Sequence, residues 1–481
     1  MYSKFKLDRR DLLKGAALSI GTVGTLSACD QQQVAPKPAS AKTKKPGIIG
    51  LDGRRVLPWS NWSGNQKSQP TLKKVPRSEA ELVDLIKGAK QSIRCVGAGH
   101  SFSPLVPTDE TLISLARLRG ISNVDKVSKQ VDIQAGTLLS KIGEPLWDKG
   151  LGLINMPDID TQSLAGAIAT STHGTGNHLG SMSSDVVALE LLDSNGEKHR
   201  CSAEQNSDLF YAACNNLGVL GVVTKVRMQA REKYLLKEES YVLRSSEAFE
   251  YAEQLRDDNR HFELFPFPHG DYIVVLLINE TTEKAQGTTQ LNIEQGEERD
   301  EAFRQVVKWT DAMPWLKSWI INMGLNSVEE SVRIDRSYGI FGNLRNMRFN
   351  EMEYSVPAEK GLECVKEVMA KIAELNIDVV FPLELRYIKG DDVWLSPFYQ
   401  RDSCSISCHN FQGRDYKNYF AAVEPIFWKY SGRPHWGKIH TLNADSLAKL
   451  YPKWQNFKDV RQQMDSRNLF LNKHLNALFV S

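Results

Sequence analysis

Residues 96–104 constrain the fold of this chain more than any other segment, because they place small residues directly after a predicted strand. The segment reads Val-Gly-Ala-Gly-His-Ser-Phe-Ser-Pro, and the strand is predicted over 93–96. Glycine and alanine let successive backbone N–H groups turn inward and hold an anion such as a pyrophosphate. The loop is not a Rossmann fingerprint, because Phe102 stands at the third glycine's position and Pro104 interrupts the following helix. The sequence therefore predicts a phosphate-binding loop of another kind.

A second group of small and hydroxyl-bearing residues lies at 164–176. Its last six residues, 171–176, read Ser-Thr-His-Gly-Thr-Gly. Such residues permit a close approach to the same ligand from a second side. Either loop alone is a weak signal, and together they are expected to bracket one ligand.

Two charged segments lie far from these loops in sequence. Glu384 and Arg386 stand two residues apart in a predicted strand, so their side chains point to one face and can share a pocket. Residues 433–438 read Arg-Pro-His-Trp-Gly-Lys. His173 and His178 do not indicate a metal site, because no carboxylate or cysteine cluster joins them at ligand spacing.

The length of 481 residues is too great for one hydrophobic core, so two domains are expected. The composition, with 41% hydrophobic and 25% charged residues, is that of a globular protein. The formal net charge of +2 provides no field that would steer nucleic acid. No nucleic-acid partner is therefore expected.

The amino-terminal segment predicts an export signal over residues 1–29. Arg9 and Arg10 precede a weakly apolar run, the arrangement of a twin-arginine signal. That run is shorter than the roughly 20 apolar residues that span a bilayer. Cys29 closes a lipobox-like Leu-Ser-Ala-Cys, which predicts a lipid anchor on the periplasmic side of the inner membrane. The alternative is a general secretory signal in which Cys29 is incidental.

Residues 30–58 are expected to act as a flexible tether, because a composition of Gln, Ala, Pro, Lys and Ser cannot bury enough apolar area to order itself. Six cysteines lie beyond Cys29, and their spacing matches neither a zinc site nor a disulfide-stapled domain. Most are expected to be buried small apolar residues. For Cys404 and Cys408, mutual pairing and a place at a site both stay open.

Strands and helices alternate along the first half of the chain, which predicts α/β layers. The expected elements are a helix opened by a capping box at 78–81, a strand over 131–135, a helix over 138–146 that stops by Gly150, a hairpin from 186–192 with its turn at Asn195 and Gly196, strands over 217–228 and 271–279, and a helix over 297–325. The aromatic run at 313–321 is expected in the core or in a helix contact rather than on a membrane, because Lys317 interrupts it.

These segments together resemble the sugar-lactone and alditol oxidases of the vanillyl-alcohol-oxidase type, a group that includes D-arabinono-1,4-lactone oxidase and L-gulonolactone oxidase. Residues 61–65 and 451–457 also match, so the resemblance runs from about Trp59 to the C-terminus. It implies an α+β fold with a two-part FAD-binding domain of the p-cresol-methylhydroxylase (PCMH) type over 59–232. An α/β cap and C-terminal domain would occupy 233–481, with the last segment returning to the FAD domain.

The resemblance implies FAD as the cofactor, bonded covalently to His100. A neutral imidazole nitrogen can attack the electrophilic form of the flavin, whereas the alternative is a loop histidine that only hydrogen-bonds. The expected cofactor-binding residues are Val96, Gly97, Ala98, Gly99, His100, Ser101, Gly166, Ser171, Thr172, His173, Gly174, Thr175, Gly176, Val222 and His435.

The same resemblance implies hydride transfer from a carbinol carbon of an aldonolactone or alditol to flavin N5, with oxygen or an electron carrier as the final acceptor. Glu384 would accept a hydrogen bond from a substrate hydroxyl, and Arg386 would stabilise developing alkoxide charge. Lys438 would place a positive charge beside the reduced flavin. The alternative is a structural ion pair of Glu384 with Arg386 or Lys438. Two other functions stay open, namely a non-catalytic exported lipoprotein that binds a partner and a flavin oxidase of a neighbouring substrate class.

Overall fold

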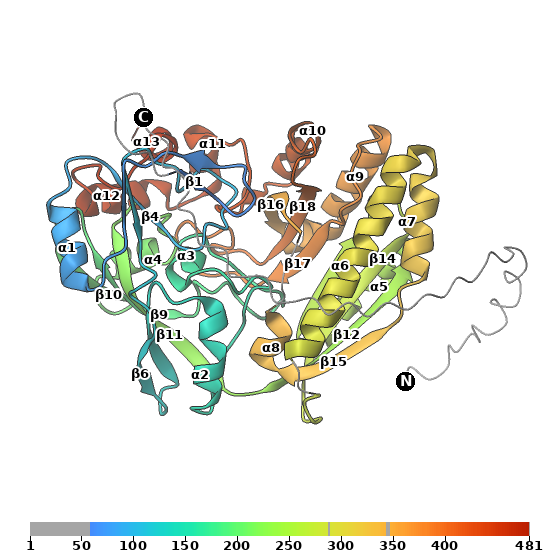
Figure 1. The fold of residues 1–481 in the computed structure, drawn as a ribbon, viewed down its shortest axis with the longest axis horizontal. Coiled ribbons are helices and arrows are strands. Elements are labelled where there is room, and N and C mark those ends of the chain that lie inside the picture. Colours follow the sequence, from blue (N-terminus) through green and yellow to red (C-terminus); the bar gives the residue numbers. More distant parts are fainter. Residues whose placement is uncertain (1–57, 287–288, 343–346, 481) are drawn as a thin grey trace, which may run out of the picture. The chain divides into compact units, whose positions relative to one another are not determined.

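The structure is a computed structural model that describes residues 58–286, 289–342 and 347–480 (Figure 1). The predicted export signal, with Cys29, and the predicted tether up to residue 57 lie outside the described residues. All described residues belong to one compact unit. None of the helices described in this unit is long and apolar enough to cross a membrane.

A small parallel sheet opens the described part of the chain. Its strand order is β3-β5-β4, and helix α1 connects β3 to β4. The elements are β3 (Leu72–Lys74), α1 (Glu79–Lys87), β4 (Ile93–Val96) and β5 (Thr111–Ser114), with β1 (Trp59–Ser60) and β2 (Lys67–Ser68) as a separate pair. The predicted small-residue loop leaves the carboxyl end of β4, which is the edge where open α/β sheets bind ligands.

An antiparallel sheet of six strands follows, with the order β10-β9-β11-β7-β6 and β8 paired to β11. Its strands are β6 (Ile121–Asp125), β7 (Gln130–Gln134), β8 (Leu151–Leu153), β9 (Val186–Leu192), β10 (Lys198–Ser202) and β11 (Val222–Glu232). Three short helices lie between them, α2 (Gly143–Trp147), α3 (Leu164–Ile168) and α4 (Ser207–Ala213).

An eight-stranded sheet forms the other half, with the order β15-β12-β14-β13-β17-β18-β16-β19 (Figure 1). Its strands are β12 (Leu235–Arg244), β13 (His261–Pro266), β14 (Tyr272–Thr281), β15 (Ser331–Arg336), β16 (Phe349–Pro357), β17 (Glu384–Ile388), β18 (Ser403–Phe411) and β19 (Arg433–Pro434). Its helices are α5 (Ser245–Asp258), α6 (Thr289–Ala312), α7 (Lys317–Asn326), α8 (Ser337–Phe341), α9 (Gly361–Glu374) and α10 (Lys417–Lys429). Residues from α5, α9 and α10 pack in one apolar core against this sheet.

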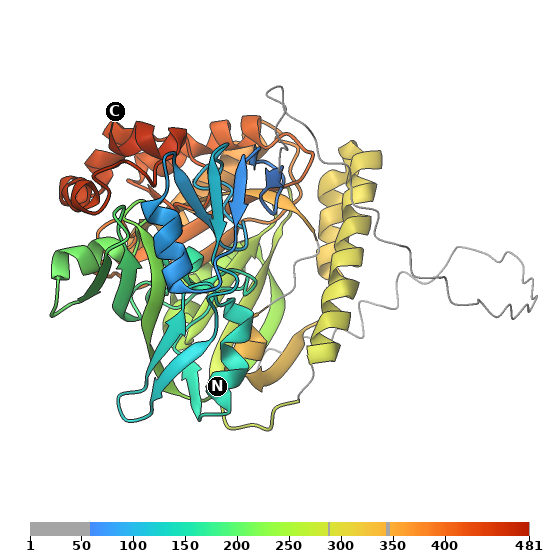
Figure 2. The ribbon, with the colours of Figure 1, turned by 60° about the vertical axis from the view of Figure 1, so that its left-hand side comes forward.

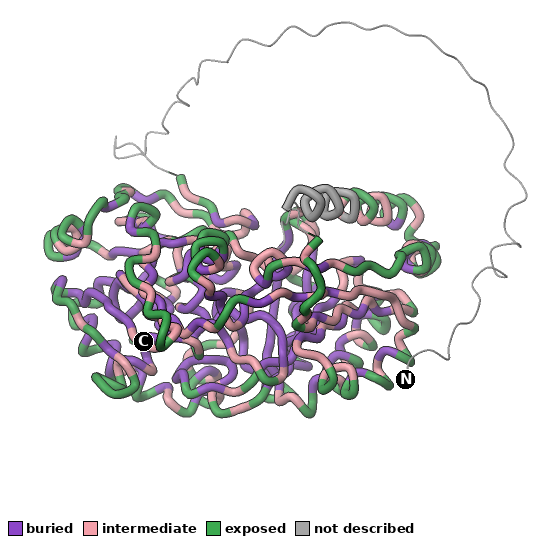
Figure 3. The backbone as a smooth tube through the Cα atoms, turned by 90° about the horizontal axis from the view of Figure 1, so that it is seen from below, coloured by how far each residue is buried: buried purple, intermediate pink, exposed green. Residues whose placement is uncertain are grey.

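The last segment of the chain returns to the first half of the molecule, as predicted. Helices α11 (Ala444–Leu450), α12 (Trp454–Met464) and α13 (Lys473–Phe479) contribute buried residues to the core that contains the six-stranded sheet. Buried residues run through the interior of both halves, and exposed residues follow the outer helices and loops (Figure 3). The small sheet is also joined to this returning segment, because Ile93 N donates to Leu469 O at 2.8 Å.

Most predicted elements are present. At the predicted capping box, Ser78 is confirmed as the N-cap of α1 because its Oγ accepts from Glu81 N at 3.2 Å, whereas the Glu81 carboxylate accepts from Arg77 N at 2.7 Å, one residue before the N-cap. The predicted helix over 138–146, which stops by Gly150, is correct only in part. Leu138 forms a β-bridge with Ser163, a 3₁₀ turn follows over Leu139–Lys141, and α2 begins only at Gly143. The bridge holds the chain extended where the apolar spacing alone predicts a helix.

Two other sequence expectations can be compared with the structure. The six cysteines of the described region are free thiols, and Cys404 and Cys408 lie buried in the core behind the large sheet. The prediction that the aromatic run is buried is correct for Ile320 and Ile321. It is wrong for the tryptophans, since Trp315 is 77% and Trp319 is 59% exposed. The predicted domain boundary at 232/233 stays a prediction, although β11 ends at Glu232.

The buried Arg94 guanidinium joins three distant segments, and we expect its loss to destabilise the fold. It donates to the carbonyl oxygens of Leu105 at 2.8 Å, Gly218 at 2.7 Å and Leu217 at 2.9 Å, and also to Phe470 O. Arg94→Met would leave these carbonyls unpaired and lower the free energy of unfolding by at least about 3 kcal/mol. Denaturant unfolding measures this loss. Substitution of the exposed Arg77 by Met should change the free energy of unfolding little, and equal stability of the two variants would contradict the stabilising role of Arg94.

Candidate active site

Alternation along three neighbouring strands builds the polar wall of the site. Successive side chains of a strand point to opposite faces. On one face, Leu385, Tyr354 and Ile406 pack into the apolar core behind the sheet. On the other face, polar residues from β16, β17 and β18 line a cavity of about 780 Å³. These cavity-lining residues are Glu351, Glu353, Glu384, Arg386 and His409.

Glu353 is the most heavily bonded of the three carboxylates. Its Oε1 lies 2.6 Å from His173 Nε2, and its Oε2 accepts from Arg386 Nη2 at 3.2 Å and from Ser407 Oγ at 3.0 Å. Its side chain is 1% exposed. Burial alone would raise the pKa of Glu353, but the positive charges of His173 and Arg386 hold it well below its usual value. The carboxylate is therefore ionised and holds two basic groups from different parts of the chain.

His173 faces hydrogen-bond acceptors with both ring nitrogens. Nδ1 lies 2.8 Å from the carbonyl oxygen of Gly174, and Nε2 faces the Glu353 carboxylate. A carbonyl and a carboxylate can only accept, so both nitrogens carry protons in this geometry. The predicted loop histidine is thus a positively charged partner of Glu353.

Glu351 holds the second basic group of the wall. Its Oε2 forms a short ion pair with Lys438 Nζ, and its Oε1 lies 3.5 Å from His409 Nε2. Although burial raises the pKa of Glu351, Lys438 and His409 lower it well below the usual range. Lys438 therefore pairs with Glu351, which the sequence did not single out, and not with Glu384.

Glu384 is the least tightly held of the three acids. It lies 3.3 Å from Arg386 Nε and 3.9 Å from His409 Nε2. Both distances are longer than a short charge-assisted hydrogen bond of about 2.7–2.9 Å. Glu384 lines the cavity while keeping oxygen lone pairs available for another hydrogen-bond donor.

His100 stands where this cavity meets a second one of about 180 Å³. The two cavities share His100, Ser101, Gln162 and Thr170 in their walls. His100 Nε2 lies 2.9 Å from Thr161 Oγ1. Burial and then the charge of Lys438 lower the pKa of His100 to about 4, so the imidazole is neutral at physiological pH.

The loop over residues 97–101 fits a phosphate-bearing cofactor. Hydrogen bonds within the described part of the chain use none of its five backbone N–H groups, and all five residues line the smaller cavity. A Cβ at Gly97 would lie 2.0 Å from Ser163 Oγ, so only glycine allows this close packing. Unpaired N–H groups around a cavity form an anion-binding concavity.

Nearly all predicted site residues line the two cavities. Thr172, His173, Gly174, Thr175, His435, Glu384, Arg386 and Lys438 line the larger one, whereas Val96 to Ser101, Gly166 and Val222 line the smaller one. Two predicted residues line neither cavity. Ser171 is buried beneath the loop, and Gly176 N donates to Tyr387 O at 2.8 Å. Gly176 thereby joins the cofactor loop to β17 through a β-bridge with Ile388.

Sequence reasoning did not find Glu351, Glu353 or Ser407 and gave His409 no role. The available signal is the Glu-x-Glu spacing within an apolar strand, which places both acids on one face just as Glu384-x-Arg386 does. A search for alternating charged pairs in apolar strands would have identified this wall.

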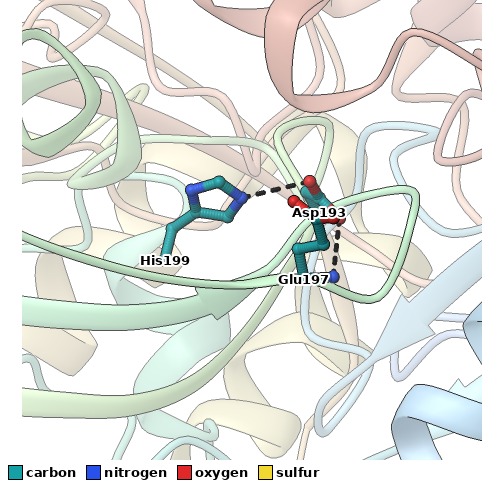
Figure 4. A group of neighbouring side chains, drawn as sticks. All are labelled: Asp193, Glu197 and His199. Atoms are coloured by element: carbon teal, nitrogen blue, oxygen red, sulfur yellow. Dashed lines mark hydrogen bonds and ion pairs between the residues drawn. The ribbon is translucent and has the colours of Figure 1, made fainter.

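A further cluster of potential metal ligands lies at the turn between β9 and β10 (Figure 4). It consists of Asp193, Glu197 and His199. Asp193 Oδ1 accepts from the backbone N–H groups of Asn195 at 2.8 Å and Glu197 at 2.9 Å, and Oδ2 lies 3.1 Å from His199 Nε2. These bonds explain the position of the Asp193 carboxylate, which accepts the hydrogen bonds of a tight turn.

Comparison with known families gives two matches. The family described as D-arabinono-1,4-lactone oxidase matches residues 226–478, and the FAD binding domain matches residues 70–202. The chain is 34% identical to an L-gulono-1,4-lactone dehydrogenase of Mycobacterium tuberculosis, covering 86% of this chain and 97% of the relative. It is 30% identical to L-gulonolactone oxidase of Mus musculus, and the match covers 89% of this chain and 100% of that relative. An alditol oxidase of Streptomyces is 25% identical, and the match covers 87% of this chain and 98% of that relative.

Solved structures of similar fold include cholesterol oxidase from B. sterolicum. The TM-score is 0.73 at 16% identity, over 93% of this chain and 100% of that one. The likeness confirms the predicted α+β fold, with a PCMH-type FAD-binding domain and a cap.

The depressed pKa of Glu353 predicts an acid-dependent loss of stability. Because the folded-state pKa lies below the unfolded value of about 4.3, ionised Glu353 stabilises the fold above that pH, and the contribution is lost as the pH falls. Glu353→Gln should cost about 3–5 kcal/mol at neutral pH by leaving Arg386 and His173 without their carboxylate. Its free energy of unfolding should also fall less steeply below about pH 5.

Denaturant unfolding at several pH values measures both effects. The exposed Glu250→Gln on α5 is the matched control and should reproduce the wild-type curve. A Glu353→Gln protein with the wild-type pH dependence would show that this carboxylate carries no such linkage.

Proposed function

Because the chain belongs to the D-arabinono-1,4-lactone oxidase family, we propose that it oxidises a CH–OH group of an aldonolactone. Its family and relatives make it an FAD-dependent oxidoreductase that acts on lactones or alditols, so the non-catalytic alternative is excluded. Relatives are named for gulonolactone, arabinonolactone and alditol substrates. The proposed preference for a lactone follows from the match of residues 226–478.

The single observation that carries the mechanism is the loose hold on Glu384. Glu351 and Glu353 are committed to close basic partners, whereas Glu384 has only the longer contacts at 3.3 and 3.9 Å. Glu384 is therefore the acid best placed to accept a hydrogen bond from a substrate hydroxyl. That bond would orient the carbinol carbon in the cavity.

Arg386 supports this role from the same strand. Two carboxylates, Glu353 and Glu384, hold its guanidinium at the cavity wall, and it keeps its positive charge because their field raises its pKa against the effect of burial. A fixed cation there would stabilise the substrate oxygen as its proton leaves. The contact between Arg386 and Glu384 at the cavity wall supports the proposal that the two residues act together on one substrate hydroxyl.

The residues of the two cavities fit FAD. The N–H groups of residues 97–101 would hold its diphosphate, and the loop from Thr172 to Thr175 would border its ring system. Bound FAD would accept the hydride from the substrate carbon at N5. Lys438, held by Glu351, would keep a positive charge near the place where negative charge accumulates on reduction.

We further propose that FAD is bonded covalently to His100. The imidazole is neutral and stands at the junction of the two cavities. Thr161 Oγ1, 2.9 Å from Nε2, can accept a hydrogen bond from the tautomer protonated at Nε2, and in that tautomer Nδ1 carries the lone pair that a bond to the flavin requires. A covalent link would also prevent loss of the cofactor outside the cytoplasm, which agrees with the proposed export through Arg9 and Arg10 and the anchor at Cys29.

Lys438→Met should slow reduction of the flavin by about 100-fold, because the fixed charge is lost. The measurement is anaerobic mixing of the FAD-loaded protein with L-gulono-1,4-lactone, D-arabinono-1,4-lactone or an alditol, followed by the loss of flavin absorbance. A lactone should reduce the wild-type protein fastest. The exposed Lys429→Met is the control and should keep the wild-type rate.

Absence of reduction by any lactone would reject the proposed substrate class, whereas an unchanged rate in Lys438→Met would reject only the role of that lysine. Reoxidation with oxygen and with a dye acceptor would then distinguish an oxidase from a dehydrogenase.

His100→Ala should release its flavin on acid precipitation, whereas the wild-type flavin should stay with the chain. Mass spectrometry of tryptic fragments should find FAD on the peptide that contains His100. His178→Ala, an exposed histidine of the second loop, should keep the attached flavin. An unmodified His100 in flavin-replete wild-type protein would disprove the covalent bond.

A further inference from the structure

An exposed aromatic patch lies at the tip of the helical hairpin formed by α6 and α7. We define the tip patch as Trp309, Trp315, Leu316, Trp319 and Met323, each of which is exposed. Trp315 and Trp319 reach 77% and 59% exposure. Trp319 and Met323 stand four residues apart on α7 and share one exposed face, and Trp315 lies in the 3₁₀ turn Pro314–Leu316 that leads into this helix. Single exposed apolar residues are ordinary on proteins, but three neighbouring indoles are not.

The opposite face of α7 fixes the orientation of this patch. Ile321 and Leu325 are buried in an apolar cluster with Val380, against residues of β12 and β14. Lys317 Nζ also binds Asp378 at 2.5 Å. The hairpin of α6 and α7 lies at one edge of the molecule (Figures 1 and 2). Its exposed tryptophans are thus carried on a packed base.

We infer that the tip patch inserts into the interfacial layer of a lipid bilayer. Tryptophan has an apolar body and one N–H donor, and it is enriched where proteins meet the headgroup region of membranes. The patch forms the end of a helical hairpin, so it can enter a bilayer surface without first opening a cleft. Two neighbouring basic side chains are neutralised, because Lys317 pairs with Asp378 and Arg414 pairs with Asp311, and Lys308 beside Trp309 is exposed. The attraction is therefore mainly apolar and does not require anionic lipid.

The chain that precedes the described residues favours a lipid bilayer, rather than another protein, as the partner of the tip patch. Residues 30–57 separate Cys29, where the sequence predicts the lipid anchor, from Pro58, the first residue that the structure describes. A stretch of 28 residues reaches at most about 90–100 Å when fully extended. A protein anchored at Cys29 would stay within that distance of a bilayer, and a weak apolar patch is effective at such a high local concentration. The inference rests on the proposed export and anchoring, not on the proposed substrate.

The test measures quenching of tryptophan fluorescence by brominated phosphatidylcholine vesicles, using the full-length FAD-loaded protein. The chain has 10 tryptophans, three of them in the tip patch, so wild-type emission should be partly quenched. Trp315→Ser with Trp319→Ser should abolish most of the quenching, while the predicted anchor still allows the variant to sediment with the vesicles. Val127→Ser should behave as wild type, because Val127 is 94% exposed on the β6–β7 turn at the opposite edge (Figures 1 and 2).

The readout separates insertion from simple tethering. A protein held only by its anchor would sediment with vesicles, but its tryptophans would not be quenched, and that result would overturn the inference. Equal quenching in the double variant would overturn it as well. A wild-type dimer that the double variant dissociates, without any quenching by lipid, would assign the patch to a second copy of the chain. Strong loss of quenching in high salt would contradict the apolar mode of binding.

Discussion

The buried ion pair of Glu353 with Arg386 and His173 is the interaction on which the site depends. Each partner comes from a different segment: Glu353 from β16, Arg386 from β17 and His173 from the loop after α3. A carboxylate buried to 1% exposure is tolerable only when its charge is paired and hydrogen-bonded. The pairing therefore requires that the cap sheet and the cofactor loop meet in one arrangement, and the β-bridge of Gly176 with Ile388 holds that arrangement beside it.

A similar dependence links the cofactor loop to the end of the chain. Gly437 O accepts hydrogen bonds from the N–H groups of Phe102 at 2.7 Å and Ser103 at 3.4 Å, and Trp436 O accepts from Ser103 Oγ at 2.5 Å. The segment that carries Lys438 thus holds the far end of the 97–101 loop in place. Within the described residues the loop's own amides stay unpaired. Its shape is fixed by these contacts just beyond it and by two of its carbonyl oxygens, because Gly99 O accepts from Trp62 N at 2.8 Å and Ser101 O accepts from Asn61 Nδ2 at 3.0 Å. The anion-binding cradle and the position of Lys438 form together.

Local patterns predicted the parts of the fold whose signal is local. Side-chain chemistry within a few residues predicts the Ser78 N-cap of α1, the strand over 93–96 and the loop after it. The acids of β16 escaped notice because alternating Glu in a strand ordinarily indicates a solvent face. Only the arrival of Lys438, Arg386 and His173 from distant positions makes that face an interior wall. The exposed tryptophans were wrongly predicted to be buried, because apolar composition indicates burial without showing which other part of the chain covers the side chains.

The charge balance of the wall also bears on which substrates it accepts. Three carboxylates, those of Glu351, Glu353 and Glu384, face the basic groups of Lys438, Arg386 and His173 at close range. These pairs make the wall formed by β16, β17 and β18 locally neutral, so a neutral hydroxyl group can approach it without adding an uncompensated charge in a place of low dielectric. Further carboxylates, among them those of Glu238 and Glu263, line the rest of the cavity. The negative charge of an open-chain aldonic acid would therefore meet an excess of carboxylates, whereas a neutral lactone or polyol would not.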